Sequence, residues 1–504
     1  MKKNILLLLL CVVAIPVLAQ QNNHYNLMIA PATLTHHRVT LLWDKQYGAE
    51  KVLYEILLNG KLSGNTGKTN FTFDALTPAT AYKVAVRMKG EKGEGASLSF
   101  KTKVRGRIFS ILDFGAKADT SYKNTKAIQA AINACTAGGV VYIPKGIFVS
   151  GALFLKSDMT LYIDKGAVLK GSTDTADYLP LYRNRFEGWE LSTYASLLNA
   201  GTLNRNGSYN VKNLRITGGG TIEGGGKKLG NAMISARGIR SRGRLICLMN
   251  CQDVSITSLT IQEPPCWTIH YIYSDNITLS DLHINSYGIR NGDGIDPDSS
   301  TDSYIFNCTF DNGDDCIAVK SGKNPEGFYV GKPTTNVRVT NCNFIRGHGI
   351  SIGSEMSGGV SDVLVQDCKA GALINGIQIK GTKERGGYVN NVTVTDCELM
   401  KITVFSALNY NNDGEAAPEP PTFENFVFKN INLSKALIKE PVININGFTD
   451  PQHRLRNVRF ENLLLPAGAK VLVTDAEHIS FTQWKNTPGD PVQFLVKNGT
   501  DVTY

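Results

Sequence analysis

The chain has 504 residues, 42% of them hydrophobic and 19% charged, which is too large for one ordinary globular core but suits two domains or an elongated solenoid. Lys and Arg outnumber Asp and Glu by 53 to 44, so the formal net charge is +9. A basic balance suits an anionic partner, although a solvated basic surface without a partner explains it too. No Arg- or Lys-rich arm occurs, so nucleic acid is the partner that the sequence favours least.

The N-terminal 19 residues are interpreted as an export signal. Two lysines precede an apolar run from Ile5 to Ile15, and a cleavage site of small residues follows at Val17-Leu18-Ala19. The run is too short to span a bilayer, and no other stretch is long and apolar enough. We therefore expect removal of residues 1–19 and a periplasmic or secreted protein with no membrane partner.

Residues 24–104 predict a small β-sandwich. Short alternating strands occur at 39–43, 52–56 and 82–87, separated by Asn-Gly and Gly-rich turns. Trp43 is a natural core residue. Leu76-Thr77-Pro78 followed by Tyr82 resembles the tyrosine corner of fibronectin type III domains, and this resemblance implies a module that spaces or positions a catalytic domain.

The pattern changes after Val104. An amphipathic helix is expected from Asn124 to Cys135, where it can cover an otherwise open sheet edge. Runs of β-type residues that open with Asn or Asp then recur, mostly every 23 to 40 residues, at Asn213, Asp253, Asn276, Asn336, Asp362, Asn391, Asn425 and Asn457. No helical pattern separates consecutive runs, so doubly wound α/β and TIM-barrel folds fit poorly.

Residues 106–504 therefore predict a right-handed parallel β-helix, and the whole chain is expected to be all-β. The irregular spacings predict longer loops that wall a groove. Nine cysteines follow the export signal, and four of them occupy one place in successive repeats: Cys308, Cys342, Cys368 and Cys397. A stacked core ladder explains these better than disulfides or metal ligands, and we predict no metal and no other cofactor.

Three carboxylates and an imidazole fall where successive coils would stack. Asp293 lies one predicted coil before the pair Asp314-Asp315, and His348 follows between Gly347 and Gly349. Adjacent carboxyls repel, so one of a pair commonly has a raised pKa, although turn chemistry also explains Asn-Gly-Asp-Asp. An inverting glycosidase needs such groups, a protonated acid and a base separated by ~6.5–9.5 Å. The pattern predicts a catalytic site.

Other polar residues near these motifs are weaker candidates. Lys380 ends an alternating strand one coil beyond the histidine and could bind a carboxylate as a point charge. Lys383 and Arg385 could do the same, but a solvated loop explains them better. Pro297 separates Asp296 from Asp298, which favours structural turn roles for both.

In this order the motifs resemble those of the polygalacturonases, glycoside hydrolase family 28. The family's Asn-Thr-Asp, Gly-Asp-Asp, Gly-His-Gly and Arg-Ile-Lys blocks look like residues 291–293, 313–315, 347–349 and 378–380, and the resemblance runs from about Phe109 to the C-terminus. It implies that Asp314 is the general acid and that His348 supports it. It also implies that Asp293 and Asp315 activate the water. The substrate-binding residues that it implies are Asn291, Gln378, Lys380 and Tyr410.

Two departures from the family pattern stand out. Gly292 replaces the usual Thr. Gln378 stands where the family has Arg, and a neutral amide cannot bind a carboxylate as a bidentate guanidinium does. A neutral leaving sugar, such as the rhamnose of rhamnogalacturonan, is therefore an open alternative to galacturonate.

The leading hypothesis is an exported, inverting, metal-independent glycosidase that cleaves α-linked galacturonic acid from pectin. Exo action is implied because the N-terminal module and Arg185-Phe186-Glu187-Gly188 are similar to bacterial exo-acting members. The expected partner is a pectic polysaccharide or oligosaccharide, galacturonan or rhamnogalacturonan, bound by a monomer. The alternatives are a pectate lyase, which would need calcium and a strong base, and a β-helical carbohydrate-binding protein.

Overall fold

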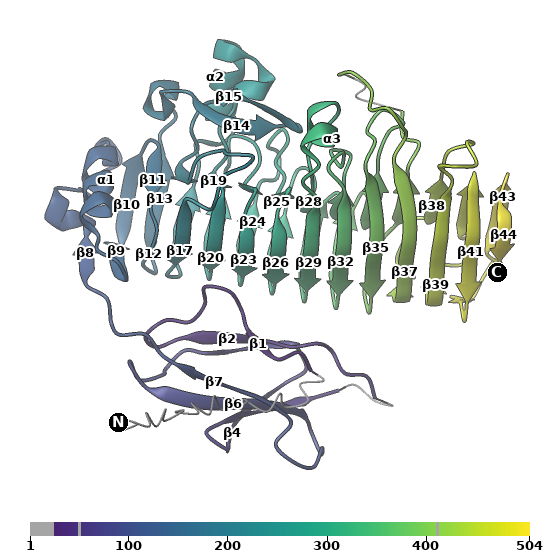
Figure 1. The fold of residues 1–504 in the computed structure, drawn as a ribbon, viewed down its shortest axis with the longest axis horizontal. Helices are drawn as coiled ribbons and strands as arrows, with labels where there is room; N and C mark the ends of the chain where they lie inside the picture. The colour runs from purple at the N-terminus through teal and green to yellow at the C-terminus, as the bar shows by residue number, and fades with distance from the viewer. Residues whose placement is uncertain (1–24, 49–51, 410–412) are drawn as a thin grey trace, which may run out of the picture. The chain divides into compact units, whose positions relative to one another are not determined.

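The computed structural model describes residues 25–48, 52–409 and 413–504 (Figure 1). The chain divides into two compact units, one with His36–Lys103 and the described residues before Ala30, the other with Ala30–Thr35 and Val104–Tyr504. Within the described part of the chain, no helix is long and apolar enough to cross a membrane. The predicted export signal and Tyr410 lie outside the described residues.

The smaller unit consists of two antiparallel sheets. One has the order β1 (Met28–Ile29), β2 (Val39–Leu42), β5 (Asn70–Phe73), and the other β4 (Lys61–Thr66), β3 (Tyr54–Leu58), β6 (Ala81–Met88), β7 (Ala96–Lys101). Trp43 is buried, with its ring edge-on to Tyr54 at 5.4 Å between centroids. The Tyr82 hydroxyl accepts a hydrogen bond from the Thr77 N–H at 2.9 Å, which is the backbone contact that a tyrosine corner makes.

The larger unit is a parallel β-helix, as predicted, with three long sheets that run along it. The first sheet has eight strands: β10 (Gly146–Ser150), β13 (Ala167–Gly171), β18 (Thr221–Glu223), β21 (Thr260–Gln262), β24 (His283–Asn285), β27 (Thr309–Asp311), β30 (Asn343–Gly347) and β33 (Lys369–Leu373). The second has twelve: β11 (Leu153–Leu155), β16 (Leu198–Ala200), β19 (Ile246–Met249), β22 (Ile269–Ile272), β25 (Ile295–Asp298), β28 (Ile317–Val319), β31 (Ile350–Ile352), β34 (Ile377–Lys380), β36 (Ile402–Phe405), β38 (Ile443–Asn446), β40 (Lys470–Thr474) and β43 (Gln493–Lys497).

The third sheet contains the strands that the Asn and Asp repeats predict. Its order along the helix is β8 (Ile108–Ser110), β9 (Gly139–Ile143), β12 (Met159–Ile163), β17 (Val211–Thr217), β20 (Cys251–Thr257), β23 (Asp275–Ser280), β26 (Thr301–Phe306), β29 (Thr334–Thr340), β32 (Val360–Gln366), β35 (Tyr388–Thr395), β37 (Thr422–Asn432), β39 (Leu455–Leu465), β41 (Ala476–Thr482) and β44 (Thr500–Thr503), with β42 (Lys485–Asn486) paired to β39.

The repeated Asn or Asp has a conformational reason. At all eight predicted repeat starts the backbone is left-handed, with φ between 52° and 63°. Among residues with a side chain, Asn and Asp tolerate this region best. Their side chains also stack from coil to coil; the Asn276 amide, for example, donates to the Asp253 carboxylate at 3.1 Å.

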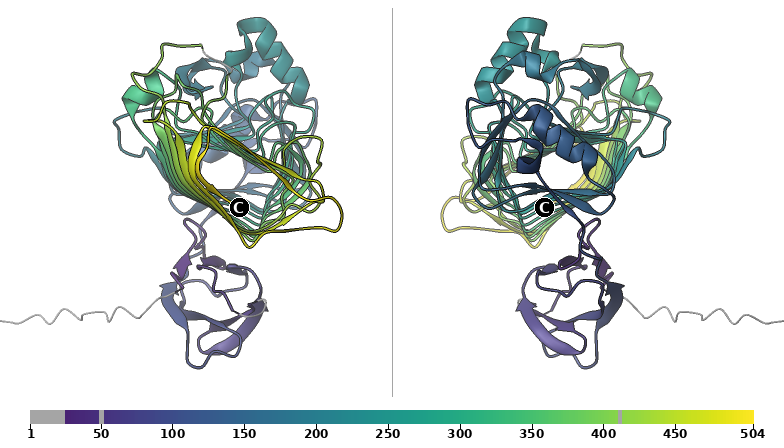
Figure 2. Two further views of the ribbon diagram at one scale, coloured as in Figure 1. Left: turned by 90° about the vertical axis from the view of Figure 1, so that its right-hand side faces the viewer. Right: turned by 90° about the vertical axis from the view of Figure 1, so that its left-hand side faces the viewer.

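The helical elements cap and decorate the coils. They are α1 (Thr125–Ala134), α2 (Gly226–Arg237), α3 (Glu326–Val330) and the short 3-10 helices η1 (Ile111–Phe114), η2 (Thr175–Tyr178) and η3 (Ile239–Ser241). α1 lies across the N-terminal end of the coils (Figure 2), and its buried Ile128 and Ile132 belong to the same apolar core as Val141 of β9. The predicted covering helix is therefore present, within one residue of its expected bounds.

The cysteine ladder is also present. Cys308, Cys342, Cys368 and Cys397 are buried in the core, and every described cysteine is a free thiol. Each of the last three places its Sγ 3.8–3.9 Å from a carbonyl oxygen of the preceding coil, at Ile305, Val339 and Val365 respectively. Stacking of one residue type follows from the register of parallel coils.

Candidate active site

Four neighbouring strands of the 12-stranded sheet bring the predicted site residues together. Register pairs Ile295 of β25 with Ile317 of β28, then Ile350 of β31, then Ile377 of β34. Asp293 lies two residues before β25, Asp314 and Asp315 lie just before β28, His348 lies two residues before β31, and Lys380 ends β34. Groups far apart in sequence thus meet at one edge of the sheet.

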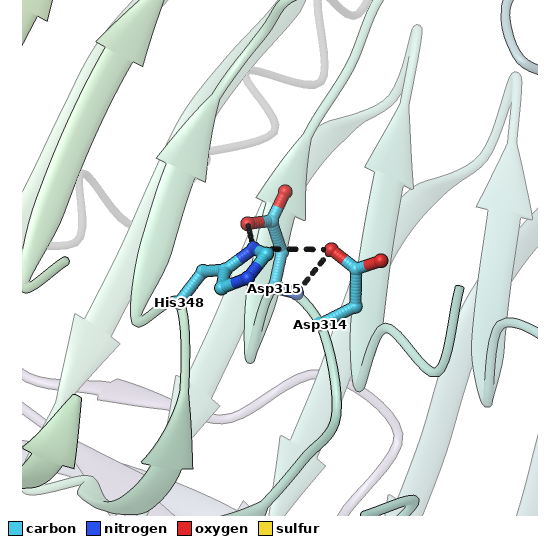
Figure 3. A group of neighbouring side chains, drawn as sticks. All are labelled: Asp314, Asp315 and His348. Carbon is cyan, nitrogen blue, oxygen red and sulfur yellow. Dashed lines mark hydrogen bonds and ion pairs between the residues drawn. The ribbon is translucent and has the colours of Figure 1, made fainter. Parts of the chain in front are cut away.

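His348 joins the two adjacent carboxylates (Figure 3). Its Nδ1 lies 3.2 Å from Asp314 Oδ1 and 3.3 Å from Asp315 Oδ1, and the Asp315 N–H donates to Asp314 Oδ1 at 2.9 Å. Hydrogen bonds to Asp314 and then to Asp315 raise the pKa of His348 to about 10. The ring is therefore an imidazolium at neutral pH.

The glycines beside His348 serve backbone packing between coils. A Cβ on Gly347, whose φ is +114°, would lie 2.6 Å from the Asp314 carbonyl oxygen, and one on Gly349, φ +84°, would lie 2.2 Å from the Gly376 carbonyl oxygen. Both positions require glycine because a side chain there meets backbone that cannot move aside. The coils lie close enough for the backbone N–H of His348 to donate a hydrogen bond to the Asp314 carbonyl at 3.0 Å.

Asp315 is the anionic member of the pair. Burial acts to raise its pKa, but the charges of Lys380 and of His348, with its hydrogen bond, outweigh burial and hold the pKa well below its usual range. Lys380 Nζ lies 3.4 Å from Asp315 Oδ2, and the Ser351 hydroxyl donates to Asp315 Oδ1 at 2.7 Å. Lys380 therefore contacts a catalytic candidate in this structure, where the sequence suggested a contact with substrate.

The raised carboxyl pKa lies on Asp293. Burial is the main cause, and the charges of Asp314 and Asp296 add to it, so its pKa is well above the usual range. The expectation was a raised pKa within the adjacent pair because like charges repel. The structure places two cations against Asp315, and burial raises the pKa of Asp293 on the preceding coil.

Lys320 is a site residue that the sequence reasoning missed. Its buried Nζ lies 3.7 Å from Asp293, 3.6 Å from Asp296 and 3.5 Å from Glu355, and 4.7 Å from the centre of the Trp267 ring. Burial opposes its charge, but these carboxylates raise its pKa well above the usual value. The signal was available in the sequence: Lys320 directly follows the β-run Ile-Ala-Val, much as Lys380 follows Ile-Gln-Ile.

Asp296 and Asp298 are not turn residues. Both lie in β25 and are fully buried, because the chain at Pro297 continues as a strand. Burial raises the pKa of Asp296 to about 8. Burial acts the same way on Asp298, but the Arg185 charge at 2.7 Å and a hydrogen bond from His270 at 3.3 Å lower its pKa to about 2.

A hairpin inserted before the repeats reaches the same region. It comprises β14 (Tyr182–Phe186) and β15 (Trp189–Thr193). Arg185, fully buried, ties it to Asp298, and the Trp189 indole donates to the carbonyl of Asn324, in the loop that follows β28, at 2.9 Å. The hairpin thus forms a wall beside the coils that carry the acids.

The remaining predicted residues have varied surroundings. Asn291 accepts a hydrogen bond on Oδ1 from Arg242 at 2.8 Å, and Gln378 accepts one from Asn375 at 3.1 Å and donates to Ser351 at 3.4 Å. Lys383 is solvent-exposed, as expected. The same expectation for Arg385 is wrong: this residue is fully buried and donates to the Ser354 carbonyl and the Asn324 side chain, because the loop after β34 folds onto neighbouring loops.

Asp314, Asp315 and His348 are also spaced closely enough to hold a metal ion, with one ligand atom from each within 4.8 Å of the others. A metal there would have to displace the proton that Nδ1 of His348 shares with the two carboxylates, because a metal-bound imidazole nitrogen must be deprotonated.

Paired carboxyl groups with different proton affinities, on a parallel β-helix, define an acid–base site of the glycosidase class. Residues 139–472 match the family described as glycosyl hydrolases family 28. The chain therefore belongs to this family and is a glycoside hydrolase. The alternatives of a lyase and of a non-catalytic binding protein are set aside.

Individual relatives cover most of the chain. It is 28% identical to an exo-poly-alpha-D-galacturonosidase of Dickeya chrysanthemi, over 94% of this chain and 92% of the relative. It is 28% identical to an endo-polygalacturonase of Pectobacterium parmentieri, over 62% of this chain and 78% of the relative. Among solved structures, the family 28 exopolygalacturonase of Yersinia enterocolitica is similar with a TM-score of 0.87 and 26% identity, over 95% of this chain and 98% of that one.

Proposed function

We propose that the protein hydrolyses α-linked galacturonic acid at the ends of pectic chains. The observation that carries the proposal is the cluster in which His348 joins Asp314 to Asp315, with Lys380 against Asp315. It provides one partly exposed carboxyl, one fixed carboxylate and two cations, His348 and Lys380. The names of the relatives from Dickeya chrysanthemi and Yersinia enterocolitica supply the substrate and the exo action.

In the proposed mechanism Asp314 donates a proton to the leaving glycosidic oxygen. Its side chain is 26% exposed, whereas those of Asp293 and Asp315 are 5% exposed, so it is the carboxyl that a polymer reaches most easily. As the proton leaves, negative charge develops on Asp314, and the imidazolium of His348 stabilises it. Asp315, already anionic, accepts a proton from the attacking water, and Asp293 orients that water after releasing its own proton to solvent before the reaction.

The stereochemical outcome has two candidates. We propose inversion, with Asp293 and Asp315 holding the water. One oxygen of Asp314 and one of Asp315 lie within 4.8 Å of each other, closer than the ~6.5–9.5 Å predicted for an inverting acid and base. That short distance favours retention as the second candidate. Proton NMR of the first product, recorded before mutarotation, decides: a β-anomer from the α-linked substrate supports inversion, and an α-anomer supports retention.

Exo action is supported by the hairpin β14–β15, whose Arg185 and Trp189 fix it beside the catalytic coils. Product size over time tests this. Galacturonic acid monomer as the first and main product supports exo action, and early oligomers of mixed length would reject it.

The sugar on the leaving side is the least constrained part of the substrate. Gln378 is neutral, so a rhamnose leaving group remains the alternative to galacturonate. Hydrolysis of polygalacturonan and of rhamnogalacturonan oligosaccharides is to be compared by mass spectrometry with EDTA present. Cleavage of polygalacturonan supports our proposal, and cleavage restricted to galacturonate–rhamnose bonds would replace it. Loss of activity in EDTA would contradict a metal-independent reaction.

We also propose that residues 1–19 direct export, that residues 24–104 form a fibronectin type III-like module and that residues 106–504 form the catalytic domain. The hydrogen bond from Thr77 to the Tyr82 hydroxyl supports the second assignment. Mass analysis of the protein isolated from its own host tests the first: a mature chain that begins at Gln20 supports export, and an intact N-terminus contradicts it.

A further inference from the structure

A second feature beside the acids is a pocket of about 350 Å³ between α2 and the turns that precede β25 and β28. Its polar lining comes from Lys227 and Asn231 of α2, from Arg242 and from Arg290. Ile289 contributes an apolar surface, and Gly313 completes the rim one residue before Asp314. The pocket is large enough for a sugar unit.

The charge of the pocket is one-sided. Three basic side chains line it, and none of its lining residues is acidic. Lys227 and Arg290 are exposed, so their charges are available to a ligand. The coil that carries Arg290 also carries Asp293, so charge in this pocket acts close to the reacting groups.

Arg242 gives the strongest indication of a ligand. It is buried and donates to the carbonyls of Ile239 at 3.0 Å and Arg290 at 2.9 Å and to Asn291 Oδ1 at 2.8 Å, which occupies three of its five N–H groups. No carboxylate within the described residues lies within 4.0 Å of it. Buried charges are normally paired, and burial together with Arg244 and Arg290 lowers the pKa of this guanidinium. An anion in the pocket would supply the missing opposite charge.

We propose that this pocket binds the carboxylate of a hexuronic acid unit beside Asp314. The proposal rests on the proposed function and assigns its acidic-sugar recognition to residues of α2, Arg242 and the turn before β25. Asn231 can hydrogen-bond a sugar hydroxyl, and Ile289 can pack against the apolar face of the ring. Along the β-helix the pocket lies toward the coils that precede Asp314, whereas Gln378 and Lys380 belong to coils that follow it.

A binding experiment with monosaccharides tests the pocket without requiring turnover. The dissociation constants of D-galacturonate and D-galactose, which differ in the carboxylate, are measured by calorimetry for the wild type and for the double variant Lys227→Ala/Arg290→Gln. We expect the wild type to prefer galacturonate at least tenfold and the variant to lose most of that preference with galactose binding unchanged. Lys228→Ala, at an exposed neighbour that does not line the pocket, is the matched control and should behave as the wild type.

The outcomes separate this inference from the proposed function. The carboxylate pocket would be overturned if the double variant lost affinity for galacturonate and galactose equally, or lost no affinity for galacturonate. This holds even if polygalacturonan is hydrolysed. Conversely, a wild type that selects galacturonate through these residues but cleaves no galacturonan would keep the pocket and reject the proposed reaction.

Discussion

At the scale of single residues, burial and neighbouring charge give each carboxyl of the site its own protonation state. Asp315 is anionic because His348 and Lys380 lie against it, and Asp298 is anionic because Arg185 and His270 do. Asp293 and Asp296 are buried with a single shared cation, Lys320, and tend to keep a proton. Groups with separated pKa values in one site are what acid–base catalysis requires.

Replacing Asp314 by Asn removes the proposed proton donor with little change in shape. We expect kcat to fall by about 10²–10⁴ while substrate binding stays within twofold, since general acid catalysis contributes about that factor. Reducing-sugar release and calorimetric binding measure the two quantities. Asp311→Asn is the control. Asp311 lies on the neighbouring strand β27 and pairs with Arg346, and this variant should keep its activity. If Asp314→Asn kept its full turnover, Asp314 would not be the proton donor.

Replacing Lys320 by Met leaves buried carboxylates without their cation. Breaking such a buried pair commonly costs about 3–5 kcal/mol, and we expect a loss of that order in urea unfolding. Adding Asp296→Asn should restore part of the stability, because it removes one uncompensated group. The acid limb of kcat/KM should also move to higher pH, since Lys320 lowers the pKa of Asp293. An unchanged profile would show that Asp293 need not ionise during turnover.

His348 makes the free energy of unfolding depend on pH. Its folded pKa of about 10 exceeds the ordinary value of 6.5, so its contribution is complete below pH 6.5 and is lost as pH rises through 10. We expect the free energy of unfolding of the wild type to exceed that of His348→Asn by a few kcal/mol at pH 6. The difference should be much smaller near pH 10.5, because each tenfold gain in proton affinity corresponds to about 1.4 kcal/mol. His283→Asn, at an exposed position on β24, is the control. A difference independent of pH would mean that the imidazolium is not paired.

At the scale of elements, the site depends on coils that stack with little room between their backbones. β28, β31 and β34 bring Asp315, His348 and Lys380 into contact because their registers align Ile317, Ile350 and Ile377. The glycines that flank His348 permit the close approach. The spacing of coils is therefore part of the geometry of the candidate site.

The variant Gly349→Ala tests that spacing. Its Cβ would lie 2.2 Å from the Gly376 carbonyl oxygen, so β31 and β34 must separate. We expect a loss of stability above about 2 kcal/mol together with a loss of activity, measured by urea unfolding and sugar release. Gly238→Ala has nearly the same φ, +88°, but its Cβ meets nothing within 4 Å, so this variant shows the effect of backbone strain without the clash. Equal effects of the two variants would contradict the role of coil spacing.

At the scale of the whole molecule, the charge of +9 suits an anionic polymer. Opposite charges accelerate encounter, and salt screens them over a distance of ~30 Å at 0.01 M and ~3 Å at 1 M. The net charge is therefore expected to attract an anionic polymer before the polymer reaches the candidate site.

Raising NaCl from 0.01 M to 0.5 M should raise KM for polygalacturonan several-fold with little change in kcat. The trimer of galacturonic acid is the control and should show a weaker dependence, because it spans less of the basic surface. A KM for the polymer that does not change with salt would show that net charge plays no part in capture.

The sequence by itself indicated the fold class and most groups of the candidate site, although it did not indicate Lys320. Asn and Asp at each repeat mark left-handed turns, and their period requires stacked coils, so Asp293, the Asp314-Asp315 pair, His348 and Lys380 had to lie on adjacent strands. These inferences succeed because a parallel β-helix converts a repeat in sequence directly into contact in space. The covering helix from Asn124 followed from its amphipathic pattern in the same way.

Only the tertiary structure decided which charges face one another. Asp296, Asp298 and Arg385 look like surface residues in sequence, yet packing buries all three against Lys320, Arg185 and Asn324. The raised pKa of Asp293 and the basic pocket around Arg242 depend on how segments of different coils pack together, and only the packed side chains show that Lys380 faces Asp315. A pKa reflects burial and the sum of nearby charges, and neither is a property of local sequence.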